Sequence, residues 1–545
     1  MNQIPTKPNF AQTIQTDLLV IGGGAAGIRA AIEARRKNIQ VLVISTSNVG
    51  SGNNSAISQG GFSAVDPQDP RDSLDLFYQD TFRAGYGLSR PFLVRKLVEG
   101  AWTEAKELET MGVVFQKDSS GDYIRVGRGG HSVPRRLATP THNGMALLSP
   151  LWKYAQGIQI SSLNGVKAVR LLQQNGQVSG ALLVNRQSEW LAVAAKAIIL
   201  ATGGGGALFP KHNNVPSATG EGYVLAYEAG LPLQDLEFVQ FTLKTQKEPG
   251  IASRIPPIEF LLLHGAVLRN PRGQSLEEAQ GRKLALTRDA LIRNVAQEIR
   301  QNPANEKFIL LDLKDLHPEV RREFSPLPEQ LMKVYPAVHY FMGGVRVEKD
   351  LTTPLSGLFA AGEVMGGIQG ANRLGGNALA EAFVFGSLAG SLAAQFVQKS
   401  GKEFLFQKHR TLREWKQMVD SLGETREGNL PELGTELQSI LGECLGVIRH
   451  QEAMERGRCR FQRLKQTFAE IDFQPLKNGW EVSTLRSKIL VAEMILQSAL
   501  TREESRGAHV REDFPDQDDK NWLCNICVRQ EKGRMNFFLE PVQPG

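Results

Sequence analysis

The sequence predicts an α/β protein whose Rossmann-like dinucleotide-binding domain is interrupted by an inserted α+β domain and followed by a helical domain. A glycine-rich strand–turn–helix–strand pattern opens the chain, and the same glycine-rich, apolar composition appears again from residue 338. Residues 403–510 show helical periodicity with charged faces. We expect a first part of the dinucleotide domain at 1–237, the inserted domain at 238–337, the second part at 338–402, the helical domain at 403–510, and a tail with short strands at 511–545.

The opening stretch TDLLVIGGGAAGIRAAIEARRKNIQVLVIS, residues 16–45, predicts a βαβ unit. In such a unit Gly22 makes the tight turn, Gly24 lets the backbone approach a pyrophosphate, and Gly27 lets the helix pack on the strand. The helix N-terminus then receives the phosphates. The second strand ends in Ser45 and Thr46 without a carboxylate for the ribose, which disfavours NAD.

Further along the chain, AVAAKAIILATGGGG at 192–206 predicts another strand that ends in a glycine-rich turn beside the cofactor. SATGEGYVLAYEAG at 217–230 predicts a tight loop and then a helix that stops at Gly230. Glu221 is either a helix-start acid or a cofactor contact. After the insertion, GLFAAGE at 357–363 predicts a strand, and 377–397 predict a long buried helix.

The inserted region has a different residue composition, which Pro-Pro and Pro-Gly pairs interrupt. It predicts an amphipathic helix near 284–300 and a strand, FILLDL, at 308–313. The tail adds strand-like pieces, LCNICV and MNFFLEPV, which we expect to fold back onto another domain.

Composition excludes several classes. The net charge of +6 over 545 residues comes without the clustered Lys and Arg of a nucleic-acid binder. The N-terminus lacks the apolar core of a signal peptide, and no apolar run is long enough to insert directly into a membrane. We therefore expect a cytoplasmic protein, either free or held at a membrane by partner subunits.

The four cysteines all lie after residue 440, and CNIC at 524–527 has redox or metal-site spacing. A four-ligand site needs a second pair, so a strand with buried thiols is the better interpretation. The chain predicts no metal site and no ligand set for an iron–sulfur cluster.

These stretches, together with SQGG at 58–61, EFVQF at 237–241, TRD at 287–289, HYFMGGV at 339–345, GANRLGGNALAE at 370–381 and ESRGAHVREDFP at 504–515, resemble the flavoprotein family of fumarate reductase, succinate dehydrogenase and L-aspartate oxidase. They occur in the family's order and span nearly the whole chain. The resemblance implies a discontinuous FAD domain, a capping domain and a C-terminal helical domain. It implies FAD bound along Gly22, Gly24, Ala25, Ala26, Gly27, Ser45, Thr46, Ser55, Gly60, Gly61, Ala201, Thr202, Gly203, Glu221, Glu363, Asn377, Ala378 and Leu379.

Many relatives attach FAD covalently through a histidine a few residues before the QGG triplet. That place is occupied here by Asn54, and no histidine lies between residues 1 and 130. An amide cannot form the linkage, so we expect noncovalent FAD. Losing the linkage generally lowers the flavin potential, which favours reduction of substrates.

In the family, hydride passes between flavin N5 and one alkene carbon while an arginine moves the proton at the other. The matching residue is Arg288; the alternative is a helix-surface arginine paired with Asp289. The resemblance also implies that His339 and Arg373 hold a substrate carboxylate, the arginine through a bidentate pair.

Other parts of the family's pocket are altered. The histidine for the second carboxylate is replaced by Thr242, and Leu263-His264-Gly265 stands where a Thr-Glu-Gly segment relays protons. Whether His264 relays protons in place of a carboxylate stays open. L-aspartate oxidase has a glutamate near the substrate amine where this chain has Arg128, followed by His131, Arg135 and Arg136, so aspartate is disfavoured. Arg128 either meets an anionic group or lies on a solvated loop.

The resemblance therefore implies an FAD oxidoreductase that acts on a C–C bond next to a carboxylate, with fumarate, succinate or a related enoate as substrate. Its electrons would come from a separate iron–sulfur subunit. Two alternatives stay open: an FAD-containing electron-transfer subunit without alkene chemistry, and an oxidase like L-aspartate oxidase. An electron carrier needs none of Arg288, His339 and Arg373, whose retention disfavours it.

Overall fold

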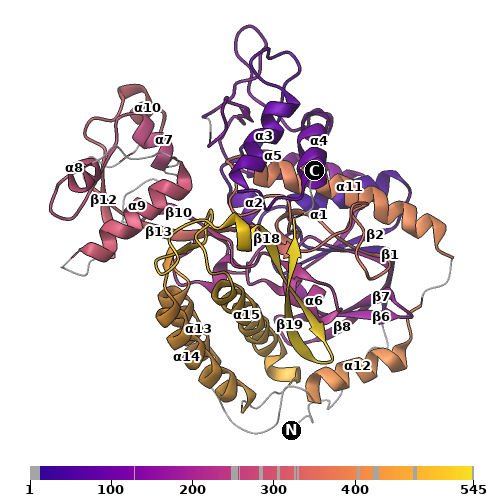
Figure 1. The fold of residues 1–545 in the computed structure, drawn as a ribbon. Coiled ribbons are helices and arrows are strands. Elements are labelled where there is room, and N and C mark those ends of the chain that lie inside the picture. Colours follow the sequence, from indigo (N-terminus) through magenta and orange to yellow (C-terminus); the bar gives the residue numbers. More distant parts are fainter. Residues whose placement is uncertain are drawn as a thin grey trace.

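A computed structural model describes residues 13–542 except 128, 247–255, 257, 282–286, 303–306, 325–326, 328–330, 402–404, 421–428 and 471–474. Figure 1 shows a large α/β body with a smaller unit, within residues 239–341, at one side. The predicted combination of a discontinuous α/β domain, an inserted α+β unit and C-terminal helices is confirmed.

The central sheet runs in the order β5-β2-β1-β8-β7-β6, and β15 also pairs with β8. Its strands are β1 (Ile14–Ile21), β2 (Val41–Ser45), β5 (Ser161–Asn164), β6 (Val166–Gln174), β7 (Gln177–Asn185), β8 (Trp190–Leu200) and β15 (Leu358–Ala360). Strands β5, β2, β1, β8 and β15 are parallel. The apolar runs that predicted β1, β2, β8 and β15 are buried, as parallel strands require, whereas the short polar strand β5 at the sheet edge was not predicted. Because β15 joins this sheet from beyond the insertion, the dinucleotide domain is discontinuous.

Helix α1 (Ala25–Arg36) lies against α11 (Asn377–Lys399), with α3 (Leu74–Ala84), α4 (Pro91–Thr110) and α5 (Met145–Gly157) nearby. Glycines let α1 and α11 approach closely: a Cβ on Gly386 would lie 2.6 Å from the Ala26 oxygen, and one on Gly390 would lie 2.3 Å from the Ala30 oxygen. By length and composition alone α11 could cross a membrane, but 67% of its most apolar window is buried in the fold. It is a core helix here.

The inserted unit is an antiparallel sheet, β10-β13-β12-β11, with short helices around it. Its elements are β10 (Val239–Thr245), α7 (Ile258–Leu263), β11 (Val267–Arg269), α8 (Leu276–Gln280), α9 (Arg288–Gln301), β12 (Ile309–Asp312), α10 (Pro318–Glu323) and β13 (Met332–Phe341). The helix expected near 284–300 is α9, and FILLDL forms β12. The expected domain boundary at 337 falls inside β13, which continues from this sheet into the main body.

The C-terminal region contains α12 (Lys408–Asp420), α13 (Leu430–Cys444), α14 (Gln451–Ala469), α15 (Pro475–Thr501) and α16 (Asp519–Trp522). The tail folds back as predicted: β18 (Cys524–Glu531) and β19 (Arg534–Pro541) join β9 (Leu233–Gln234) and β14 (Gly344–Val345) in one sheet. The Cys524 and Cys527 thiols are free and buried in β18, which confirms the strand interpretation.

Short elements complete the fold around the site. They are α2 (Asn54–Ile57), β3 (Phe62–Ser63), β4 (Arg136–Leu137), α6 (Glu221–Glu228), β16 (Ile448–Arg449), β17 (Val510–Arg511) and the 3₁₀ turns η1 (Gly206–Leu208) and η2 (Gly362–Val364).

Candidate functional site

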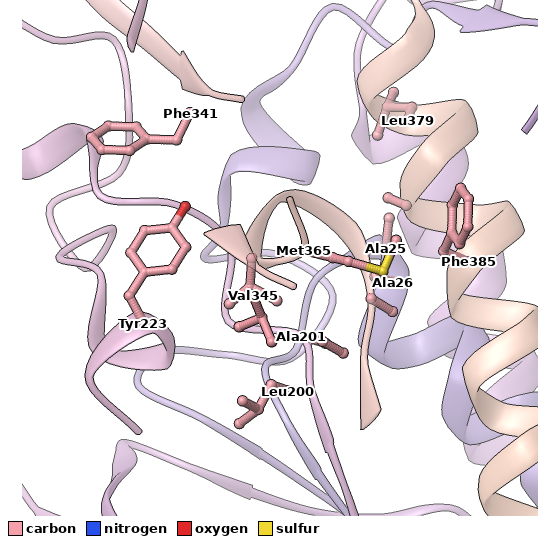
Figure 2. Packing of buried hydrophobic residues seen from close by; sticks show 14 of the residues in the cluster. Ala25, Ala26, Leu200, Ala201, Tyr223, Phe341, Val345, Met365, Leu379 and Phe385 are labelled. Atoms are coloured by element: carbon pink, nitrogen blue, oxygen red, sulfur yellow. The ribbon is translucent and has the colours of Figure 1, made fainter. Parts of the chain in front are cut away.

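The turn between β1 and α1 has no room for side chains. Gly22 has φ +126°, and a Cβ there would lie 2.0 Å from the Ala201 carbonyl oxygen; a Cβ on Gly27 would lie 1.9 Å from the Gly22 oxygen. Figure 2 shows that the side chains beside this turn, Ala25, Ala26 and Ala201, are small. The turn can therefore bring its backbone amides close to a phosphate at the helix N-terminus.

Two further segments close over this turn. The Ala25 amide donates to Ser55 Oγ at 3.2 Å, and the Asn53 amide donates to the Gly23 carbonyl at 3.0 Å, so α2 lies against the start of α1. Ser45 is at the end of β2, where its hydroxyl accepts from the Ser47 amide at 3.3 Å. Thr46 follows at the same sheet edge. Three predicted cofactor residues therefore lie beside the β1–α1 turn: Ser45, Thr46 and Ser55.

Several of the polar atoms that are buried without a hydrogen-bond partner in the described part of the chain lie at or beside predicted cofactor positions. They are Thr202 Oγ1, Asn377 Oδ1, Thr139 Oγ1 near Gly60, Arg136 Nε near Gly61, and Thr219 Oγ1 two residues before Glu221. A buried polar group without a partner costs about 1–3 kcal/mol. A ligand carrying phosphates, hydroxyls and a polar heterocycle satisfies such groups, so the residues present fit FAD.

Glu363 of η2 lies against the glycine turn after β8. A Cβ on Gly204 would lie 2.3 Å from Glu363 Oε1, and Oε1 accepts the Phe341 amide at 3.1 Å. Burial raises the pKa of Glu363 to about 7, although the Phe341 amide and Arg373 oppose this rise. A Cβ on Gly203 would lie 3.9 Å from Glu363 Oε2. Ala378 and Leu379 lie in the first turn of α11, where Figure 2 labels Leu379.

Glu221 lies away from these contacts. It is the first residue of α6, and its charge raises the pKa values of Lys167 and Lys488, which burial lowers. Its place at the start of α6 suits a helix-start acid, and the neighbouring Gly222 packs against Thr202, so a cofactor contact also stays a prediction.

Arg373 is 5% exposed, in the loop before α11. Its Nη2 donates to Gln240 Oε1 at 2.8 Å, Nη1 donates to the Leu374 carbonyl at 2.9 Å, and Nε has no partner among the described residues. The guanidinium lies over the Tyr340 ring, 4.6 Å from its centroid. Burial and the charge of Arg288 lower the Arg373 pKa to about 10, so it stays cationic at neutral pH.

His339 lies on β13, and its Nδ1 is 3.1 Å from Asn213 Oδ1. Burial, followed by the charges of Arg373 and Arg288, holds the pKa of His339 well below its ordinary value. A neutral imidazole that donates from Nδ1 to Asn213 leaves Nε2 for the site. The mutual influence of His339, Arg373 and Arg288 shows that three segments bring their basic groups together.

Arg288 begins α9 and forms an ion pair with Glu259 of α7 (Nε to Oε1, 3.0 Å); its Nη1 is buried without a partner among the described residues. Burial alone would raise the pKa of Glu259, but Arg288 and Arg136 outweigh it, and the pKa is lowered. Burial and the charge of Arg288 lower the pKa of Arg136 to about 10.

The partner of Arg288 is therefore Glu259 rather than His264. The His264 ring lies 4.2 Å from the Phe260 ring, and its Nδ1 is 2.8 Å from the Phe260 carbonyl oxygen. Within the described residues, no hydrogen bond or ion pair joins His264 to the three basic residues. Glu259, five residues before His264, is the carboxylate that contacts Arg288, and the sequence analysis did not single it out.

The glycine loop before β4 has two roles. Arg135 is fully buried and pairs with Asp72 at 2.6 Å and Asp80 at 2.7 Å, while His131 contacts Arg135 at 2.9 Å. These residues stabilise the fold, and Arg136, the next residue, turns toward Arg288. Arg128 lies outside the described residues.

Asn54 begins α2 and is fully engaged. Its Oδ1 accepts the Val215 amide at 2.9 Å, and its Nδ2 donates to Asn214 Oδ1 at 2.5 Å. Asn214 in turn donates to the His339 carbonyl at 3.2 Å. The position of the relatives' linking histidine is thus tied to the strand that carries His339.

Comparison with known proteins agrees with this geometry. A model of the FAD binding domain matches residues 17–379, and one of the fumarate reductase flavoprotein C-terminal region matches 434–544. One subunit of the fumarate reductase (CoM/CoB) of Methanothermobacter marburgensis is 32% identical, over 96% of this chain and 98% of its own length. An uncharacterized FAD-dependent oxidoreductase of Methanocaldococcus jannaschii is 30% identical, over 95% of this chain and 97% of its own length. A solved variant of E. coli quinol fumarate reductase FrdA superposes with a TM-score of 0.88 at 27% identity, covering 98% of both chains.

Proposed function

The chain belongs to the family of fumarate reductase flavoproteins, and we propose that it reduces the C=C bond of a small carboxylate, either fumarate or a related enoate. As a family member it is an FAD-dependent oxidoreductase that acts on CH–CH groups. The observation that supports this substrate class is the meeting of half-buried Arg288 with the interior residues His339 and Arg373. Glu259 already pairs with Arg288, whereas Arg373 forms no ion pair within the described residues, so a substrate carboxylate can balance its charge.

The residues have separate tasks in this proposal. Bound FAD supplies the two-electron chemistry, as a hydride at N5. Arg373 donates from Nε to the carboxylate next to the double bond. His339 donates to it from Nε2 once the negative charge of the bound substrate has favoured protonation of the ring. The positive charges of Arg373 and Arg288 also stabilise the negative charge that develops on the carboxylate as the alkene is reduced.

Arg288 donates the proton at the other alkene carbon. An arginine holds its proton tightly in water, so a donor arginine needs neighbours that weaken this hold and return the proton. The nearby cations Arg136 and Arg373 favour the loss of the proton. Glu259, ionised at neutral pH because its pKa is lowered, accepts the next proton and passes it to Nε of Arg288.

The far end of the pocket departs from the dicarboxylate pattern. Thr242, the counterpart of the second-carboxylate histidine, is 9% exposed on β10, opposite Ala337. A threonine hydroxyl offers one hydrogen bond and no charge. We therefore include monocarboxylates of the crotonate type beside fumarate.

Electrons come from a separate iron–sulfur subunit in this proposal. The described residues contain no cluster of three or more His, Cys, Asp or Glu side chains that could hold a metal. The protein is then cytoplasmic, either free or held at a membrane by such subunits, as part of an electron-transfer complex.

The direct test is anaerobic reoxidation of the dithionite-reduced holoprotein by fumarate, crotonate and other enoates, followed by flavin absorbance. Rapid reoxidation by at least one enoate supports the proposal. Reoxidation by oxygen alone, with oxygen uptake on succinate or aspartate, would instead identify an oxidase. No reaction with any of these acids would leave the electron-transfer alternative.

FAD should leave the protein on acid or heat denaturation. Asn54 has no nitrogen that can form the linkage, and its amide is already bonded to Asn214 and Val215. After denaturing electrophoresis, flavin fluorescence should run with the dye front. Fluorescence in the protein band would contradict noncovalent binding.

Replacing Arg373 by Lys should raise the apparent KM at least about tenfold, because hydrogen bonds to charged groups contribute about 1.5–3 kcal/mol and lysine loses the planar fork. FAD content should not change. Steady-state kinetics on the best enoate provide the measurement, and unchanged kinetics would place Arg373 outside the substrate pocket.

A further inference from the structure

Tyr86, in the loop between α3 and α4, has a backbone conformation that needs external support. Its φ is +53°, in the left-handed region that a tyrosine rarely adopts. Such residues persist where the surrounding structure holds them, and they gather at functional sites. The neighbours of Tyr86 therefore indicate what the loop holds in place.

The backbone of this loop is held from two sides. Arg506, fully buried and paired with Glu504 at 2.7 Å, donates from Nη1 to the Tyr86 carbonyl at 2.8 Å. The Ala371 amide donates to the Gly85 carbonyl at 3.0 Å. Because Ala371 is two residues before Arg373, the Tyr86 loop is fixed to the segment that carries Arg373.

The Tyr86 side chain reaches the inserted unit. Its hydroxyl donates to Asp289 Oδ2 at 2.7 Å, and Asp289 is in the first turn of α9, directly after Arg288. The Tyr86 ring packs against the apolar cluster that includes Tyr340, over whose ring Arg373 lies. One side chain thus contacts the start of the Arg288 helix and the support of Arg373.

We propose that Tyr86 is a positioning residue: its hydrogen bond to Asp289 fixes the first turn of α9 against the FAD-binding domain and so sets Arg288 opposite Arg373. This inference rests on the proposed function for its effect on turnover. Arg288 and its partner Glu259 both belong to the inserted unit, so their ion pair moves with that unit. The Tyr86 bond instead crosses from the main body to the unit, beside the reacting residues.

The test compares Tyr86→Phe with the matched control Tyr78→Phe, on the neighbouring helix α3, where the ring stacks on Phe82 at 5.8 Å. For Tyr86→Phe we expect about tenfold slower flavin reoxidation by the enoate, with FAD content and dithionite reduction unchanged. Asp289→Asn keeps an acceptor oxygen, so its flavin reoxidation rate should fall less than that of Asp289→Ala. The Tyr78 variant should match the wild type.

Two readouts separate positioning from a general structural role. Hydrogen exchange in the peptide covering residues 288–301 should be faster in Tyr86→Phe and unchanged in Tyr78→Phe. In an Arg288→Gln background, Tyr86→Phe should slow the residual reaction less than about twofold, because both changes act through one group.

Unchanged exchange at the start of α9, or a full tenfold loss on top of Arg288→Gln, would overturn the inference. If the wild type reduces no enoate, the proposed function fails, and hydrogen exchange alone still decides whether Tyr86 holds α9.

Discussion

Replacing Arg288 by Gln should leave FAD bound and reducible by dithionite, while reoxidation by the enoate falls about 10²- to 10⁴-fold, the usual contribution of general acid catalysis. Glutamine keeps a polar side chain near Glu259 but has no proton to give at neutral pH. Substrate binding should weaken less than turnover, since Arg373 and His339 still hold the carboxylate. Single-turnover reoxidation at several substrate concentrations separates the two effects.

The matched control is Arg300→Gln on the same helix. Arg300 is half exposed and pairs with Glu512 at 2.8 Å on the surface, so its loss removes an arginine from α9 without touching the site. The control should react like the wild type. If Arg288→Gln also turns over normally, a different group supplies the proton, and the assignment of Arg288 is wrong.

The FAD-binding part of the fold could be predicted because its signals are local. The β1–α1 turn itself needs glycine at position 22, where φ is +126°, and at position 27, where a Cβ would lie 1.9 Å from the Gly22 carbonyl oxygen. The runs at 18–21 and 193–200 are buried parallel strands, which read as continuous apolar stretches. Glycine positions and apolar runs of this kind reflect short-range geometry, so they can be recognised in a single sequence.

The contact between Arg288 and Glu259 could not be predicted in the same way. Glu259 lies in PPIEFLLL, where no glycine follows the glutamate as it does in the family's Thr-Glu-Gly segment, so the sequence pattern pointed to Leu263-His264-Gly265 instead. The contact that identifies Glu259 joins residues 29 positions apart on two helices. The signal that remained was a single carboxylate in an apolar run, which needs a partner when it is buried.

Arg136 and Asn54 were visible in the sequence, but their partners were not. Arg136 begins β4 directly after the buried Arg135, and the two arginines have different neighbours: Arg135 pairs with Asp72 and Asp80, while Arg136 is near Arg288. Asn54 predicts the missing flavin linkage by its chemistry alone. Its bonds to Asn214 and Val215, about 160 residues away, depend on packing that no local pattern encodes.

Glu259→Gln and His264→Gln form the pair that decides which residue returns the proton. Glutamine at 259 keeps the size of the side chain and an oxygen for Arg288 Nε, but it cannot carry a proton. We therefore expect the turnover number to fall about 10²-fold. Carboxylate binding should stay equal or tighten, because the site loses one negative charge near Arg288 and Arg136.

His264→Gln should stay within about twofold of the wild type, because its ring contacts Phe260 rather than the arginines. The measurement is the turnover number together with the Kd of malonate, a non-reacting dicarboxylate, from the perturbed flavin spectrum of each variant. A large loss in His264→Gln with normal Glu259→Gln would reverse the assignment and make the imidazole the relay. Equal loss of malonate binding in Glu259→Gln would show that Glu259 only maintains the shape of the pocket. The expected split, slow turnover with intact binding, is what a carboxylate that moves protons through Arg288 must produce.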